Sequence, residues 1–365
     1  MRRVRVLIVA GSTVIRRQLR NALADVPAIE VGGVAASGQI ALAKIPQISP
    51  DLVILSLEMP DTDELRTLTE LRKSFPHLPV IMWSALPQDR TVAMLNALSL
   101  GACDYVTKPV NIGNTMSVFQ HVREARIPKI KALCGIEDGP NCSLPARTVK
   151  AKRPISACTG PVQIIAIGVS TGGPKALADI FRQLPGDLPV PIVLVQHMPA
   201  DFTKYLAERL NAISPLEVRE AKDGDRIEAG QAWLAPGNYH MSLDRAGTGT
   251  IIRLHQGPPE NSCRPAVDVL FRSVAELFGP ASLAVVLTGM GQDGLRGCEA
   301  IRDAGGQIIV QDKVTSVIWG MPGAVANMGL ANQVLPLAKI TEEIIRLTTG
   351  LRGRKTPNLF ASIDL

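Results

Sequence analysis

The sequence predicts two α/β domains, each built on a doubly wound parallel sheet and joined by a basic linker. Short apolar runs alternate with helical patterns through the first 125 residues, and a second alternation of the same kind begins at residue 163. Between them, residues 126–160 lose all periodicity. The 365 residues are enough for two domains, and 46% hydrophobic against 4% aromatic residues indicates cores of Val, Ile, Leu and Ala.

The first domain is expected over residues 1–125. Its apolar strand candidates are followed by helical spacing, as in VIRRQLRNAL, ELRTLTELRKSF and RTVAMLNALSLG. Five β/α units in so short a segment favour a small flavodoxin-like sheet. The strands are expected at 4–10, 30–35, 51–57, 79–85 and 104–109.

Residues 126–160 are rich in Pro, Gly and Lys/Arg and are expected to form a linker, entered from a helix that ends near Gly135. The second domain is expected over 161–350, with a helix over 174–184 and antiparallel hairpins within 216–260. Residues 351–365 are a polar tail. The parallel strands of this domain are expected at 163–170, 191–197, the start of 282–294, and 307–312.

Charge and composition exclude several functional classes. The net charge is +6, but the linker alone holds seven basic and two acidic residues, which argues against a folded nucleic-acid-binding surface. No apolar run approaches the roughly 20 residues of a membrane helix, and the one at the N-terminus is too short for a signal peptide. Six cysteines show no metal-ligand spacing. A cytoplasmic protein with reduced thiols, no metal and no membrane-embedded segment is expected.

The segment GVSTGGPKA follows a predicted buried strand and opens a helix. It lacks the Gly-Lys-Ser/Thr of a phosphate-binding loop, because Pro174 separates Gly173 from Lys175. Its glycines also miss the dinucleotide-binding spacing. Gly168, Ser170 and Gly172 do match the G-x-S-x-G turn of serine nucleophiles, although a serine that caps the following helix would give the same pattern.

Two further strand ends supply partners for this serine. His197 ends the strand PIVLVQH, and Asp293 lies in the glycine-rich loop after SLAVVLTG. Loops at the carboxyl ends of parallel strands converge on one crevice. Ser170 is therefore predicted to attack a carbonyl, His197 to take and return the proton, and Asp293 to orient the imidazole.

The oxyanion of such a reaction needs backbone N–H donors. The amides of Thr171 and Gly172, at a helix N-terminus, are the first candidates, and the backbone of Met290 and Gly291 is the second. The other histidines, at 77, 121, 240 and 255, lie in the first domain or in hairpin-like segments and are weaker candidates.

The order of motifs GVSTGGP, QHMPADFTKYLAERLN, AKDGDRIEAGQAWLAPGNYHM, GPPENSCRPAVDVLFRSVA and VLTGMGQDGLRG resembles the catalytic domain of the CheB family of chemotaxis protein-glutamate methylesterases. The resemblance covers most of residues 162–348 and places that family's Ser, His and Asp on Ser170, His197 and Asp293. It implies hydrolysis of γ-glutamyl methyl esters on cytoplasmic helices of chemoreceptors, with release of methanol, deamidation of selected receptor glutamines, and no cofactor. Other chemotaxis signalling proteins are further expected partners.

Within CRPAVD, Arg264 and Asp268 resemble family residues beside the active site, where scaffolding and substrate contact are equally open roles. Cys263 stands where the family usually has histidine.

Residues 1–125 resemble a response-regulator receiver domain that lacks the acidic residues needed for phosphorylation. Lys108 and the hydroxyl of Ser84 are retained, but Ala10 and Gly11 replace the acid pair and Ser56 replaces the phosphorylated aspartate. Magnesium binds through carboxylate oxygens, so neither a magnesium site nor a phosphoacceptor is expected. Asp51 would lie at the wrong end of the sheet, Asp61 and Asp63 would need rearrangement, and phosphorylation of Ser56 by a separate kinase is a minor alternative.

Three functions follow from these patterns. The first is a working receptor methylesterase with a pseudo-receiver. The second is a non-enzymatic adaptor, and the third is a serine hydrolase acting on another protein ester or amide. The complete Ser-His-Asp set favours the first.

Overall fold

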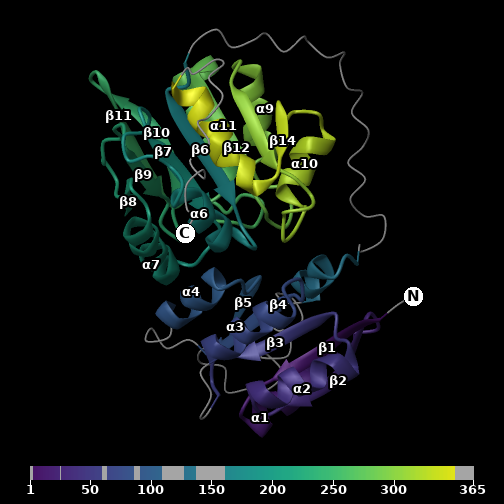
Figure 1. The fold of residues 1–365 in the computed structure, drawn as a ribbon. Coiled ribbons are helices and arrows are strands. Elements are labelled where there is room, and N and C mark those ends of the chain that lie inside the picture. Colours follow the sequence, from purple (N-terminus) through teal and green to yellow (C-terminus); the bar gives the residue numbers. More distant parts are fainter. Residues whose placement is uncertain are drawn as a thin grey trace, which may run out of the picture.

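The computed structural model describes residues 3–24, 26–59, 64–85, 91–108, 127–136 and 161–349. Two α/β units lie one above the other in Figure 1, and both sheets are doubly wound. The fold class predicted from the sequence is confirmed.

The first unit is a parallel sheet in the order β2-β1-β3-β4-β5. The central strand, Leu52–Ser56, is buried at every position because helices cover both faces of the sheet. Helix Thr13–Ala24 shows the expected amphipathic spacing, with Ile15, Leu19 and Leu23 on its buried face. The elements are β1 Val4–Val9, α1 Thr13–Ala24, β2 Ile29–Ala35, α2 Gly38–Ile48, β3 Leu52–Ser56, α3 Glu64–Ser74, β4 Val80–Ala85, α4 Thr91–Ser99 and β5 Asp104–Lys108.

The second unit has a seven-stranded sheet in the order β14-β13-β12-β6-β7-β9-β8, and every pairing in it is parallel. The elements are β6 Ile164–Val169, α6 Gly173–Phe181, β7 Ile192–Gln196, α7 Ala200–Ile213, β8 Glu217–Glu220, β9 Gln231–Leu234, β10 His240–Ala246, β11 Gly249–His255, α8 Val267–Phe278, the short helix η2 Gly279–Ala281, β12 Ser282–Val286, α9 Leu295–Asp303, β13 Gln307–Gln311, α10 Met321–Asn327, β14 Gln333–Leu335 and α11 Leu337–Thr349.

The antiparallel arrangement expected within 216–260 is confirmed for β10 and β11 and is wrong for the first part of this segment. Strands β8 and β9 join the edge of the main sheet as parallel neighbours of β7, and only β10 and β11 form an antiparallel hairpin. The turn-rich sequence does not distinguish the two arrangements, because the choice depends on which distant strand offers a free edge.

The predicted boundary between the first domain and the linker also needs correction. Residues 127–133 are helical, and Ile130 is fully buried in the core of the first unit. Residues 127–136 therefore belong to that unit. Residues 137–160 and 351–365, which contain the rest of the expected linker and the tail, lie outside the described residues.

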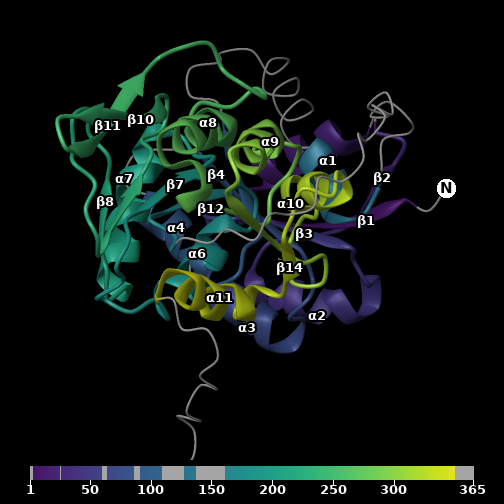
Figure 2. The ribbon, with the colours of Figure 1, turned by 90° about the horizontal axis from the view of Figure 1, so that it is seen from above.

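Helices α6, α7 and α11 cover one face of the second sheet, and α8, α9 and α10 cover the other (Figures 1 and 2). Met94, Leu95 and Leu98 of α4 belong to the same buried apolar cluster as Phe202 of α7. Hydrophobic packing is thus continuous between the units. No helix of the described chain has both the length and the apolarity to cross a bilayer.

Candidate active site

The three residues singled out by the sequence follow three adjacent strands of the large sheet. Asp293 comes after β12, Ser170 after β6 and His197 after β7, and these strands are neighbours in that order. Strand order reverses at β6, which is where crevices form in such sheets. Ser170 and His197 both line a cavity of about 340 Å³ at this edge.

His197 and Asp293 form a hydrogen-bonded pair. The distance between His197 Nε2 and Asp293 Oδ2 is 2.7 Å, and the Asp293 side chain is only 2% exposed. The same carboxylate accepts backbone N–H bonds from Val267, Asp268 and Gly294. Burial alone would raise the pKa of Asp293, but these donors and His197 outweigh it and hold the pKa below its usual value.

This pairing determines which imidazole nitrogen is available for chemistry. An ionised Asp293 accepts the proton on Nε2, so the neutral ring presents a lone pair at Nδ1. Burial lowers the pKa of His197, but the hydrogen bonds with Asp293 and Cys263 and the charge of Asp293 outweigh burial and raise the pKa to about 9.

A pH dependence follows from this pKa. Turnover of the full chain is expected to rise with pH through about 9, because His197 accepts a proton only when neutral and its raised pKa keeps it charged near pH 7. The check is a pH–rate profile corrected with Ser170→Ala. Cys263→Ala, which removes one of the hydrogen bonds that raise this pKa, should move the rising limb to lower pH. A limb centred at the ordinary histidine value of 6.5 would contradict the assignment.

Ser170 is held through its backbone. Its N–H donates to Thr288 O at 3.0 Å, and its carbonyl accepts from Gln196 Nε2 at 3.0 Å. The left-handed residue of the turn is Gly172, with φ of 81°, whereas Ser170 has no positive φ. Ser170 Oγ has no hydrogen-bond partner in the described part of the chain, so proton transfer from Ser170 to His197 stays a prediction.

The first unit occupies one of the two candidate sites for the oxyanion. Gly172 N–H donates to the carbonyl oxygen of Cys103 at 3.0 Å, and Thr171 Oγ1 donates to Asp104 Oδ2 at 2.7 Å. The backbone N–H groups of Met290 and Gly291 have no acceptor among the described residues. A substrate carbonyl would therefore compete with Cys103 for the Gly172 amide.

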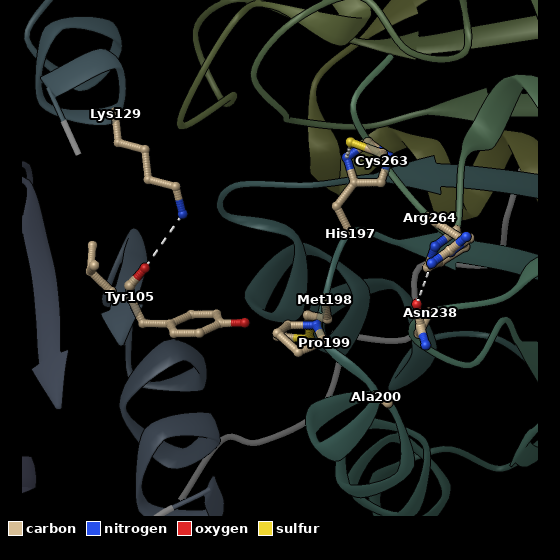
Figure 3. Close-up of a pocket in the computed structure, with 11 residues that line it drawn as sticks. Tyr105, Lys129, His197, Met198, Pro199, Ala200, Asn238, Cys263 and Arg264 are labelled. Atoms are coloured by element: carbon tan, nitrogen blue, oxygen red, sulfur yellow. Dashed lines mark hydrogen bonds between the residues drawn. The ribbon is translucent and has the colours of Figure 1, made fainter. Parts of the chain in front are cut away.

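The first unit also forms a wall of the crevice. Figure 3 shows Tyr105 and Lys129 across a second cavity, of about 510 Å³, from His197. The Tyr105 ring stacks on Phe202 with 4.8 Å between centroids, and Lys129 Nζ lies 2.9 Å from Asp104 Oδ1. A hydrogen bond between Arg209 and Asn96 adds a further contact. In this closed arrangement, Cys103, Asp104 and Tyr105 of the first unit line the same cavity as Ser170.

Arg264 joins two loops beside the site through hydrogen bonds. Its guanidinium donates to the carbonyls of Gln256 and Gly257 and to Asn238 Oδ1, the last shown in Figure 3. Of the two roles left open by the sequence, these contacts favour scaffolding.

Burial raises the pKa of the neighbouring Asp268 to about 6.

Sequence reasoning missed Asn261 and Gln196. Asn261 Nδ2 donates to both Asp268 Oδ2 and Asp293 Oδ1, at 2.8 and 2.9 Å. Gln196 Nε2 bonds the carbonyls of Ser170 and His197. Gln196 immediately precedes the predicted histidine, which was the one available signal, whereas nothing in the sequence pairs Asn261 with Asp293.

The phosphorylation site of a receiver is not reproduced in the first unit. Ser56 is fully buried, and its Oγ accepts the Glu58 N–H at 3.1 Å. The guanidinium of Arg16 donates to the carbonyls of Ala10 and Gly11, where a receiver has its acid pair. These residues do not fit magnesium, and the described residues contain no cluster of three or more potential metal ligands.

The remaining predicted positions of this unit are placed only in part. Ser84 is buried in β4, and Asp51 lies just before β3, at the opposite end from Ser56. Lys108 ends β5, but its side chain lies outside the described part of the structure, as do Asp61 and Asp63.

Fold and site together define a two-domain response regulator whose output domain is a hydrolase. A family model for the CheB methylesterase matches residues 165–344, and one for the response regulator receiver domain matches residues 6–120. The chain belongs to the protein-glutamate methylesterase/protein-glutamine glutaminase family.

This membership rests on relatives that match nearly the whole chain. A protein of that name from Trichodesmium erythraeum is 54% identical over 95% of this chain and 99% of its own length. Another from Nocardioides sp. is 45% identical over 97% of this chain and 98% of its own. The crystal structure of the Thermotoga maritima CheB methylesterase catalytic domain is 43% identical and covers 52% of this chain and 100% of that one, with a TM-score of 0.50.

Proposed function

We propose that this protein hydrolyses the methyl esters of glutamate side chains on chemoreceptors and releases methanol. The observation that carries the proposal is the buried His197–Asp293 pair beside Ser170, at the ends of adjacent strands. The names of the relatives, which are 54% and 45% identical, support the same substrate class. Their second name supports deamidation of receptor glutamines at the same site.

The reaction proceeds in two steps. His197 Nδ1 takes the Ser170 proton as Oγ attacks the ester carbonyl, and the resulting imidazolium protonates the departing methoxide. Water, deprotonated by His197, then releases the glutamate carboxylate. The N–H groups of Met290 and Gly291, and Gly172 once Cys103 withdraws, stabilise the oxyanion.

The partners are methylated cytoplasmic helices of chemoreceptors, and the protein acts in the cytoplasm beside other chemotaxis signalling proteins. The deciding experiment offers the full chain chemoreceptor membranes with labelled methyl groups and counts volatile methanol, with Ser170→Ala as control. Release that disappears in the control supports the proposal. Receptor binding without release would instead indicate an adaptor, and hydrolysis of other protein esters with none of receptor esters would indicate a different substrate.

The first unit is proposed to be a pseudo-receiver. Acetyl phosphate, or beryllofluoride with magnesium, is expected to leave turnover and domain arrangement unchanged, because Ala10, Gly11 and Ser56 supply neither metal ligands nor an acceptor. Turnover and small-angle scattering with and without each reagent are the measurements. A stoichiometric, hydroxylamine-sensitive phosphate on this unit, accompanied by higher activity, would show that the prediction is wrong.

A further inference from the structure

His197 has a second potential proton donor besides Ser170. Cys263 Sγ lies 3.6 Å from His197 Nδ1, the nitrogen whose lone pair the Asp293 contact leaves free. Figure 3 shows the sulfur against the imidazole ring. Thiol, imidazole and carboxylate thus form a connected chain, which is the arrangement that activates cysteine nucleophiles.

The turn that carries Cys263 is held firmly. Glu260 and Cys263 exchange two backbone hydrogen bonds, of 3.0 and 2.9 Å, across Asn261 and Ser262, which both have positive φ. Glu260 forms a bidentate ion pair with Arg272, and Asn261 is bonded to Asp293. Glu260 is thus fixed to α8 through Arg272, and Asn261 is fixed to the site through Asp293. These contacts hold the Cys263 thiol in place before a substrate binds.

Cys263 is also accessible. Its side chain is partly exposed and lines both cavities of the site, of about 510 and 340 Å³. In the closed arrangement the Gly172 N–H is bonded to the Cys103 carbonyl oxygen. Cys263 lines the cavity of about 510 Å³ together with Tyr105, Lys129 and His197, and Ser170 is not part of that lining.

We infer that Cys263 is a second nucleophile, which shares His197 and Asp293 with Ser170 and accepts acyl groups from small activated esters and thioesters. His197 Nδ1 takes the thiol proton, and the thiolate attacks the carbonyl carbon. The bond to the leaving group breaks as the C–S bond forms, and the imidazolium returns the proton to the leaving group. Water, with His197 as base, then hydrolyses the enzyme thioester to a carboxylic acid and the free thiol.

The leaving group separates this activity from methyl ester hydrolysis. Methoxide leaves much less readily than a thiolate, so attack of Cys263 on a methyl ester reverses by loss of the thiolate. Aryl esters and thioesters have leaving groups good enough to complete the transfer. This activity goes beyond the proposed receptor methylesterase and does not require Ser170.

The test uses the full chain with Ser170→Ala and the probe p-nitrophenyl acetate near pH 9, where a large fraction of His197 is neutral and can accept the thiol proton. Acetylation of each cysteine is followed by peptide mass spectrometry, with the partly exposed Cys134, whose thiol contacts a backbone carbonyl rather than an imidazole, as internal reference. Cys263 should react faster than Cys134. Adding His197→Ala should slow Cys263 by about 100-fold, the scale of lost general-base catalysis, and leave Cys134 unchanged.

An unchanged Cys134 rate reports that the first unit is folded, and circular dichroism of each variant checks the second unit. Cys263→Ala should abolish the fast adduct. Acetylation of Cys263 at the Cys134 rate, or no effect of His197→Ala, would overturn the inference. Because every arm lacks Ser170, the result is independent of whether the protein releases methanol from receptors.

Discussion

Replacing Ser170 by alanine is expected to lower methanol release from receptor methyl esters by about 10⁴-fold or more, the scale seen when one member of a catalytic triad is removed. Among the described residues of the site, the Ser170 hydroxyl is the group expected to add to the methyl ester and to expel methoxide from the tetrahedral intermediate, which leaves the acyl-enzyme. His197→Ala and Asp293→Asn should each cost orders of magnitude as well. The measurement is labelled methanol released under single-turnover conditions.

The double variants provide the sharper check. Because the three residues act as one unit, Ser170→Ala combined with His197→Ala should be little slower than Ser170→Ala alone. The fold should persist in each, since Ser170 and His197 reach the crevice from strands that are buried on both faces. Near-normal turnover of His197→Ala would show that the proposed general base is wrong.

The second large effect concerns the first unit. Removing residues 1–160 is expected to raise turnover on receptor esters by about 5- to 150-fold, the range of typical couplings between two sites. The physical reason is that Cys103 O occupies the Gly172 amide and that Asp104 and Tyr105 cover the crevice. The catalytic domain of the Thermotoga maritima relative was crystallised without its receiver domain, so we expect the shortened chain to fold by itself.

A point substitution tests the same contact in the full chain. Asp104→Ala removes the acceptor of Thr171 Oγ1 and the partner of Lys129, so it should raise turnover in the same direction. Glu342→Ala removes a carboxylate from the exposed ion pair with Lys339 on α11 and serves as matched control. If deletion and Asp104→Ala both leave turnover unchanged, the closed arrangement does not inhibit the enzyme.

Much of the architecture is encoded locally and was therefore predictable. Apolar runs such as 51–57 and 163–170 can be satisfied only as strands buried on both faces, and the structure has β3 and β6 there. Because parallel strands expose their carboxyl ends at one edge, the sequence also predicted that Ser170, His197 and Asp293 would gather. The absence of acidic residues at positions 10, 11 and 56 is likewise a matter of residue identity alone.

The contacts between distant segments were decided only by the tertiary structure. The parallel pairing of β8 and β9, the bridge from Asn261 to Asp293, the thiol of Cys263 against His197, and the Cys103 carbonyl on Gly172 all join residues whose separation along the chain carries no periodic signal. Hydrophobic periodicity determines which face of an element is buried. It does not determine which of several polar loops meets which, because that depends on how complete elements and complete domains pack against one another.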